Sequence, residues 1–131
     1  MEEKKTKILL VDDDRFLLDM YTLKFKKSNV IVDTAAGSVS ALAKLRGGED
    51  ANIVLLDIIM PSMDGLELLS TIREEKLVPD ATIIILSNQN DDMEKAKEIG
   101  IDGYIIKATS IPSEVVEKVL AIYQNKILHK K

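Results

Sequence analysis

The chain has 131 residues, of which 46% are hydrophobic and 31% charged, and its formal net charge at pH 7 is −4. This length suits one domain with a hydrophobic core, and the acidic, mixed charge argues against direct nucleic-acid binding. The lack of cysteine excludes disulfides, zinc thiolate sites and thiol catalysis. No signal peptide or membrane-spanning run is found, which predicts a cytoplasmic protein that does not contact a membrane.

Five short runs of apolar and β-branched residues are predicted to form strands. In chain order they cover residues 8–11, 30–34, 53–56, 82–86 and 104–106. Their continuous apolar character is typical of strands that are buried on both faces. Each run is followed by a segment with helical spacing of its apolar residues or with helix-capping signals. These predicted helices cover residues 15–27, 38–46, 64–76, 92–99 and 112–127.

The strict alternation of strands and helices predicts a parallel sheet that is covered by helices on both faces. Right-handed crossovers and five strands fit a doubly wound α/β fold with strand order 2-1-3-4-5 and five helices. We interpret residues 1–131 as a single domain with a core of about residues 6–124 and flexible ends at residues 1–5 and 126–131. Asp14 and Ser38 are expected to cap the first two helices.

Polar side chains follow the predicted strands at the point where each strand ends. They are Asp12, Asp13, Asp57, Ser87 and Lys107. The carboxyl ends of parallel strands share one edge of a sheet, so three carboxylates would meet there and raise a pKa by repulsion unless a cation joins them. Carboxylate oxygens suit Mg²⁺, while the lysine and the serine hydroxyl suit a phosphoryl group. The set predicts an aspartyl-phosphate site with Asp57 as the nucleophile.

Four segments that together span residues 8–107 resemble a known family. They read ILLVDDD, LLDIIMPSMDGLELL, IIILS and GIDGYIIK. The chain resembles the response-regulator receiver domains of two-component signalling and is similar in length and layout to the stand-alone chemotaxis regulator. The resemblance implies a flavodoxin-like fold and a phosphorylation-dependent signalling switch. Such a switch promotes its own phosphorylation and dephosphorylation but is not a turnover enzyme.

The resemblance also implies a role for each residue of the site. Asp12, Asp13, Asp57 and the main-chain carbonyl of Ile59 would hold Mg²⁺, with Asp13 as a direct ligand. Asp57 would accept a phosphoryl group from a sensor histidine kinase, a phosphotransfer protein or a small acyl phosphate. Lys107 would pair with that phosphoryl group.

Two further residues would carry the switch. Ser87 would move toward the phosphoryl group, and Tyr104 would then turn inward, although a tyrosine at such a position is more often simply packed. The surface of the fourth helix, fifth strand and fifth helix would change and regulate an output partner, which the sequence does not identify. The chain would be a monomer or a phosphorylation-dependent dimer.

The chain departs from the family pattern at two positions. Asn88 stands where receivers commonly have a small residue, which would narrow access to the phosphoryl group. Ala108 follows Lys107 where the family typically has a cis proline. Because a non-proline cis bond costs about 3 to 4 kcal/mol, we expect a trans Lys107–Ala108 bond and a rearranged loop.

Two other functions compete with the signalling switch. A degenerate receiver would bind a partner without phosphorylation, which Asn88 and Ala108 slightly favour. A Mg²⁺-dependent phosphohydrolase of the haloacid-dehalogenase type would need a second aspartate two residues after Asp57, where this chain has Ile59. We also expect Asp57→Ala to be tolerated for folding, because it relieves repulsion among the acids.

Overall fold

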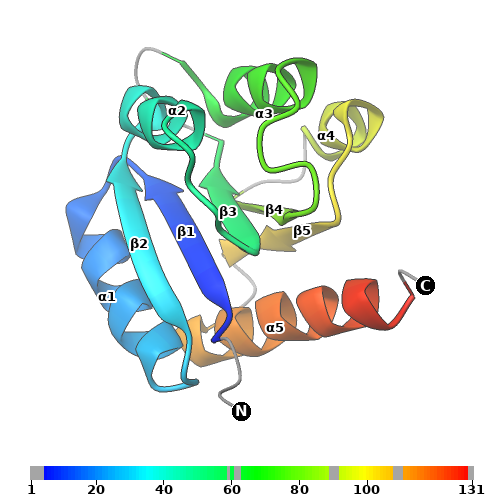
Figure 1. Cartoon of the computed structure of the whole chain (residues 1–131). Coiled ribbons are helices and arrows are strands. Elements are labelled where there is room, and N and C mark those ends of the chain that lie inside the picture. Colours follow the sequence, from blue (N-terminus) through cyan, green and yellow to red (C-terminus); the bar gives the residue numbers. More distant parts are fainter. Residues whose placement is uncertain (1–4, 59, 61–62, 89–91, 108–110, 130–131) are drawn as a thin grey trace.

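The computed structural model describes residues 5–129 except 59, 61–62, 89–91 and 108–110. Strands and helices alternate along this part of the chain, as predicted (Figure 1). The strands are β1 (Lys7–Asp12), β2 (Ile31–Ala36), β3 (Ile53–Asp57), β4 (Thr82–Ser87) and β5 (Gly103–Ile106). The helices are α1 (Arg15–Lys26), α2 (Ser38–Arg46), α3 (Gly65–Glu74), α4 (Met93–Ile99) and α5 (Pro112–Leu128).

All five strands pair in parallel in the order β2-β1-β3-β4-β5, which confirms the predicted doubly wound sheet. The register pairs Val11 of β1 with Leu56 of β3. The residues that follow them, Asp12 and Asp57, therefore reach the same carboxyl edge of the sheet on neighbouring strands. On the other side of β3, Asp57 pairs in register with Leu86 near the end of β4.

Two hydrophobic layers cover the sheet. The helices α2, α3 and α4 pack on one face, and α1 and α5 pack on the other (Figure 1). Alternate residues of each strand belong to opposite layers: Val54 and Leu56 of β3 to the first, Ile53 and Leu55 to the second. None of these four side chains is more than 3% exposed. Burial on both faces explains why the strands are continuous apolar runs in the sequence.

The first two helices begin in different ways. The Asp14 carboxylate accepts hydrogen bonds from the main-chain N–H groups of Phe16 at 3.0 Å and Leu17 at 3.3 Å, which confirms the predicted cap of α1. The predicted cap of α2 is wrong. Gly37 takes the cap position with a φ of 109°, a conformation that favours glycine, so that Ser38 becomes the first helical residue and its side chain is buried.

The edge strand β2 ends two residues later than predicted. Its pairing with β1 continues to the pair of Asp12 with Ala36. Ala35 and Ala36 add little to the apolar, β-branched signal of the sequence, whereas main-chain pairing does not depend on side-chain size. Main-chain hydrogen bonding therefore sets the end of this strand.

The last helix, α5, is fixed to the sheet near its carboxyl end. Lys126 Nζ donates to the carbonyl of Ala81 at 2.9 Å and lies 3.1 Å from Asp102 Oδ2. The same carboxylate oxygen accepts a hydrogen bond from the main-chain N–H of Ile83 at 2.8 Å. The helix continues to Leu128, and the predicted limits of the domain core stay a prediction. None of the helices in the described part of the chain is long and apolar enough to cross a membrane.

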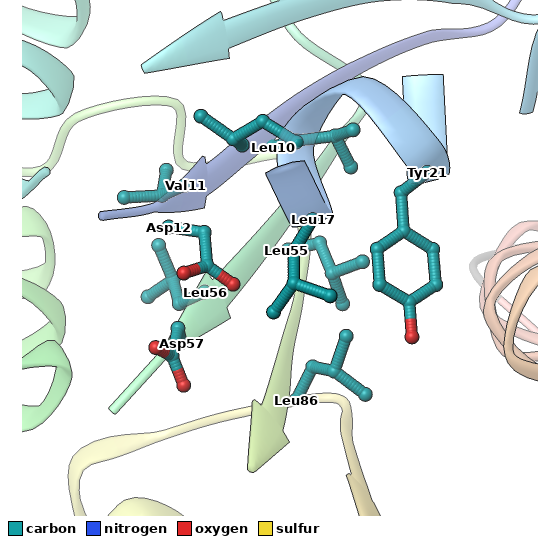
Figure 2. Close-up of a pocket in the computed structure, with 10 residues that line it drawn as sticks. Leu10, Val11, Asp12, Leu17, Tyr21, Leu55, Leu56, Asp57 and Leu86 are labelled. Atoms are coloured by element: carbon teal, nitrogen blue, oxygen red, sulfur yellow. The ribbon is translucent and has the colours of Figure 1, made fainter. Parts of the chain in front are cut away.

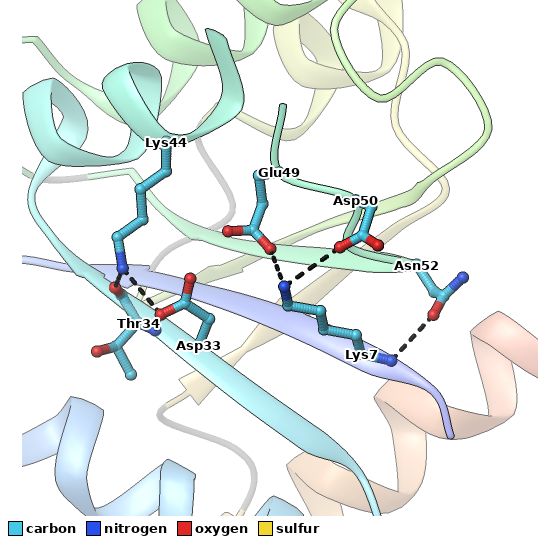
Figure 3. A network of polar contacts seen from close by, with 7 residues as sticks. All are labelled: Lys7, Asp33, Thr34, Lys44, Glu49, Asp50 and Asn52. Carbon is cyan, nitrogen blue, oxygen red and sulfur yellow. Dashed lines mark hydrogen bonds and ion pairs between the residues drawn. The ribbon is translucent and has the colours of Figure 1, made fainter. Parts of the chain in front are cut away.

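A buried carboxylate connects the start of β1 with the loop between α2 and β3 (Figure 3). The side chain of Glu49 is 7% exposed, and its Oε1 lies 2.6 Å from Lys7 Nζ. Lys7 also pairs with Asp50 at 3.2 Å, and its main-chain N–H donates to Asn52 Oδ1 at 2.9 Å. Two side chains of this loop and the start of β3 are thus held by one residue of β1.

Replacing Glu49 with glutamine should lower the free energy of unfolding by about 2 kcal/mol, because a partly buried ammonium loses its nearest carboxylate. Chemical denaturation at pH 7 measures this change. Glu75→Gln is the matched control, since it removes the same charge from the exposed Arg46–Glu75 pair and should have little effect. Equal losses in the two variants would show that the burial of Glu49 is unimportant.

Candidate functional site

Three carboxylates meet where β1 and β3 end. Asp12 is the last residue of β1, Asp13 follows it, and Asp57 is the last residue of β3. One carboxylate oxygen of each residue lies within 4.8 Å of the other two. Asp12 Oδ1 also accepts a hydrogen bond from the main-chain N–H of Asp14 at 3.0 Å, which fixes its orientation. The structure thus brings together the three acids that the sequence placed at one sheet edge.

Lys107, directly after β5, supplies a positive charge to this cluster. Its Nζ lies 3.3 Å from Asp12 Oδ2 and 3.6 Å from Asp57 Oδ1. The exposed fractions of the Lys107, Asp12 and Asp57 side chains are 13%, 10% and 13%. Charges held so far out of water interact more strongly than surface ion pairs. The sequence placed Lys107 near Asp57 but did not predict its contact with Asp12.

An apolar wall lies on the buried side of the acids. Figure 2 shows Asp12 and Asp57 at one end of the residues that line a small cavity and Tyr21 at the other end, with Leu17 and Leu55 between them. The cavity measures about 20 Å³, which is room for about one water molecule. The buried side of Asp57 therefore faces apolar side chains and little free volume.

Burial is the main reason why the pKa of Asp57 rises from 3.8 to about 6. Lys107 opposes this rise, and the negative charges of Asp12 and Asp13 add to it. The sequence predicted a raised pKa but attributed it to repulsion among the acids, whereas loss of hydration is the larger cause. At pH 7 the carboxyl group is still mostly ionised.

The cluster has the composition that a hard divalent cation requires. Three carboxylates against one lysine leave two excess negative charges when all four groups are ionised. Asp13 is exposed, so one side of the cluster is open to solvent and to a further ligand. Oxygen ligands with an open side fit Mg²⁺, which keeps several waters when bound. The residues present therefore fit the predicted metal.

The two predicted switch residues lie on neighbouring strands. Ser87 ends β4, is 1% exposed and pairs in register with Ile106 of β5. Tyr104 is partly buried and packs against the hydrophobic layer of α2, α3 and α4. Asn88, the first departure from the family pattern, is exposed directly after β4. Tyr104 is thus packed in this structure, and its inward turn stays a prediction.

Gly65 is a residue of the site that was not among the predicted site residues. Its main-chain N–H donates to the carbonyl of Ile58 at 2.7 Å. A Cβ at position 65 would collide with the carbonyl oxygen of Asp57 and the Cα of Ile58. The missing side chain therefore lets α3 begin directly against the end of β3. The adjacent Asp64 carboxylate accepts a hydrogen bond from the main-chain N–H of Glu67 at 2.9 Å and caps the helix.

Two predictions fall outside the residues that the structure describes. One is the main-chain carbonyl of Ile59 as a metal ligand, and the other is the trans bond between Lys107 and Ala108. Both stay predictions. His129, the single histidine of the chain, is exposed at the end of α5.

Comparison with known proteins gives matches along most of the chain. The response regulator receiver domain family matches residues 8–120. The transcriptional regulatory protein ResD of Bacillus subtilis is 36% identical over 92% of this chain and 49% of its own length. The chemotaxis protein CheY of Halobacterium salinarum is 33% identical over 81% of this chain and 88% of its own length. The chain spans about half the length of ResD and of the PhoP regulator of Bacillus subtilis.

Solved structures agree with this assignment. A CheY-like receiver domain from Methanospirillum hungatei superimposes with a TM-score of 0.84 at 28% identity, covering 94% of this chain and 97% of the other. TrrA from Thermotoga maritima, solved in complex with Mg²⁺-BeF, gives a TM-score of 0.77 at 31% identity and covers 89% and 98%. The fold, the acidic cluster and these matches lead to one conclusion: the chain belongs to the response regulator receiver domain family.

Proposed function

We propose that this receiver domain is a Mg²⁺-dependent switch that accepts a phosphoryl group on Asp57. The observation that supports it most is the meeting of Asp57 with two further acids and Lys107 at a buried sheet edge. Receiver domains act as signalling switches rather than turnover enzymes. The switch would promote its own phosphorylation and dephosphorylation.

Asp57 is the proposed nucleophile. One of its carboxylate oxygens attacks the phosphorus atom and forms an O–P bond. The bond from phosphorus to the donor breaks, and its electron pair leaves with the imidazole of a histidine kinase or phosphotransfer protein, or with the carboxylate of a small acyl phosphate. The pKa of about 6 keeps the attacking carboxylate mostly ionised at pH 7 while burial limits its hydration. Both conditions favour attack.

The remaining charged residues would stabilise the product. Asp12, Asp13 and Asp57 would hold Mg²⁺, together with the carbonyl of Ile59 that the family resemblance implies. Bound Mg²⁺ would offset the negative charge of the acids and of the phosphoryl oxygens. Lys107, now 3.6 Å from Asp57, would donate to a phosphoryl oxygen. The complex of the similar protein TrrA with Mg²⁺-BeF supports the same chemistry here.

Ser87 and Tyr104 are the proposed link between the site and the output surface. The Ser87 hydroxyl, at the end of the strand next to β3, would donate to a phosphoryl oxygen. Tyr104 would then turn further into the layer against which it packs, changing the face of α4, β5 and α5. That face would regulate an output partner. The protein itself would be cytoplasmic and either a monomer or a phosphorylation-dependent dimer.

Two alternatives remain distinguishable from this proposal. A degenerate receiver would keep the fold and bind a partner regardless of phosphorylation, but the intact acids and Lys107 argue against it. A phosphohydrolase of the haloacid-dehalogenase type would need a general acid where this chain has Ile59. The signalling switch is therefore favoured.

Adding Mg²⁺ with beryllium fluoride should produce saturable amide shifts around Asp57 and in α4, β5 and α5. Beryllium fluoride stands in for the phosphoryl group, so the charge at the site changes as it would on phosphorylation. Asp57→Asn is the control and should show none of these shifts. A wild-type protein that fails to respond would refute the switch and leave the degenerate receiver.

The stability of the metal-free protein should depend on the ionisation of Asp57. Its folded pKa of about 6 lies above the unfolded value of 3.8, so protonation favours the fold. The stabilising contribution is full below about pH 4 and is lost as the pH rises through 6. Asp57→Asn should therefore raise the free energy of unfolding at pH 8 by about 1 to 2 kcal/mol, after allowance for solvent screening and the lost Lys107 pair.

Denaturation at pH 8 and pH 4 in a chelator tests this dependence. The gain should be absent at pH 4, and Mg²⁺ at pH 8 should stabilise the wild-type protein more than Asp57→Asn. If Asp57→Asn is less stable than the wild type at both pH values without metal, ionised Asp57 does not destabilise the metal-free fold and the prediction is wrong.

Mixing the protein with a chromogenic phosphate monoester and Mg²⁺ should release only a small amount of alcohol and no sustained enzymatic turnover, because the proposed donors are a phosphohistidine and an acyl phosphate and because Ile59 stands where a phosphohydrolase would have its general acid. The absorbance of the released alcohol measures this amount. Sustained release that is abolished in Asp57→Asn would instead favour the phosphohydrolase.

A further inference from the structure

A surface groove of about 450 Å³ lies between α3 and α4, which pack side by side in the same helix layer (Figure 1). Both helices and the residue before α3 line it: Asp64, Leu66, Glu67, Ser70, Lys95, Glu98 and Ile99. None of these residues belongs to the cluster around Asp57. The groove is thus a surface that the proposed phosphorylation chemistry leaves unused.

The rim of the groove is acidic. Asp64, Glu67 and Glu98 contribute three carboxylates against the single ammonium of Lys95. In the part of the chain that the structure describes, Glu67, Glu98 and Lys95 form no ion pair within 4.0 Å. The Asp64 carboxylate caps α3 by accepting a hydrogen bond from the main-chain N–H of Glu67. The rim therefore presents two excess negative charges to a partner.

The floor of the groove is apolar. Leu66 and Ile99 are partly buried and pack against the hydrophobic layer beneath the two helices. A small cation would gain nothing from this floor, and nucleic acid would be repelled by the rim. An amphipathic helix with one apolar and one basic face matches both features. We propose that the groove between α3 and α4 docks a basic amphipathic helix of a partner protein.

The size and rigidity of the groove agree with that occupant. The α3 wall from Asp64 to Ser70 spans about 9 Å at about 1.5 Å per residue, which matches nearly two turns of a partner helix. At the other end, Arg73 Nε donates to the carbonyl of Gly100 at 3.0 Å and holds the end of α4 against α3. Two groove walls that are already joined in the free protein need less ordering on binding.

The probe is a synthetic leucine–lysine peptide of roughly 14 residues, which forms an amphipathic helix of about four turns. Titration into ¹⁵N-labelled protein should give saturable amide shifts at the groove residues of α3 and α4. A peptide with glutamate in place of lysine should give none. Shifts confined to α1 and α5 would overturn the proposal, and so would a wild-type protein without saturable shifts.

Charge variants make the test specific. The double variant Glu67→Gln and Glu98→Gln should weaken binding about fivefold, because each exposed ion pair adds a fraction of a kcal/mol. Asp19→Asn with Glu117→Gln removes the same charge from exposed positions of α1 and α5 and should leave the affinity unchanged. If both double variants weaken peptide binding equally, the peptide is attracted by net charge alone, and docking in the groove is refuted.

A blocking variant provides an independent readout. Ser70→Arg places a long cationic side chain in the groove and should abolish the saturable shifts, whereas Gln124→Arg on exposed α5 should not. Unaltered binding to Ser70→Arg would also overturn the proposal. Docking does not require phosphorylation, so Asp57→Asn should bind the peptide like the wild type. Peptide binding to the groove can therefore fail while the phosphorylation switch holds, and the switch can fail while the peptide still binds.

Discussion

The register between β1 and β3 is the constraint on which the site depends. Pairing of Val11 with Leu56 brings Asp12 and Asp57 to the same edge on neighbouring strands. Both strands are covered on two faces, so the carboxylates reach the edge with their buried side against leucine side chains. A one-residue shift of β1 relative to β3 would place Asp12 and Asp57 on opposite faces of the sheet and disperse the cluster.

Dehydration gives the cluster its chemistry and also its cost. The raised pKa of Asp57 means that its ionised form destabilises the metal-free fold near neutral pH. Lys107 reduces this cost but does not remove it, since the loss of hydration outweighs the attraction of one ammonium. A divalent cation would neutralise the two excess negative charges. The same cluster can therefore reduce the stability of the metal-free fold and suit the binding of a cation. Such a local cost to stability is common at functional sites.

The sequence predicted the features that depend only on the pattern of apolar residues along the chain and on the parallel topology. Continuous apolar runs located the strands, and the rule that strand ends share one edge brought Asp57 and Lys107 together. It was less informative where the outcome depends on three-dimensional contact. The close approach of Gly65 to Asp57 and the backbone angle that displaced the α2 cap from Ser38 to Gly37 are local, but no apolar pattern reveals them. The dominance of burial in the pKa shift of Asp57 depends on atoms far apart in sequence.

The groove and the site share structural elements although they share no residue. The α3 wall begins at Gly65, which lies against the carbonyl of Asp57, and the α4 wall follows the strand that ends in Ser87. If phosphorylation shifts α4 relative to α3, it changes the affinity of the groove for a helix. Linkage then requires the bound helix to change the phosphorylation equilibrium by the same factor. Under that condition, a partner in this groove would both sense the switch and bias it, and the Arg73–Gly100 hydrogen bond would resist motion at the carboxyl end of α4.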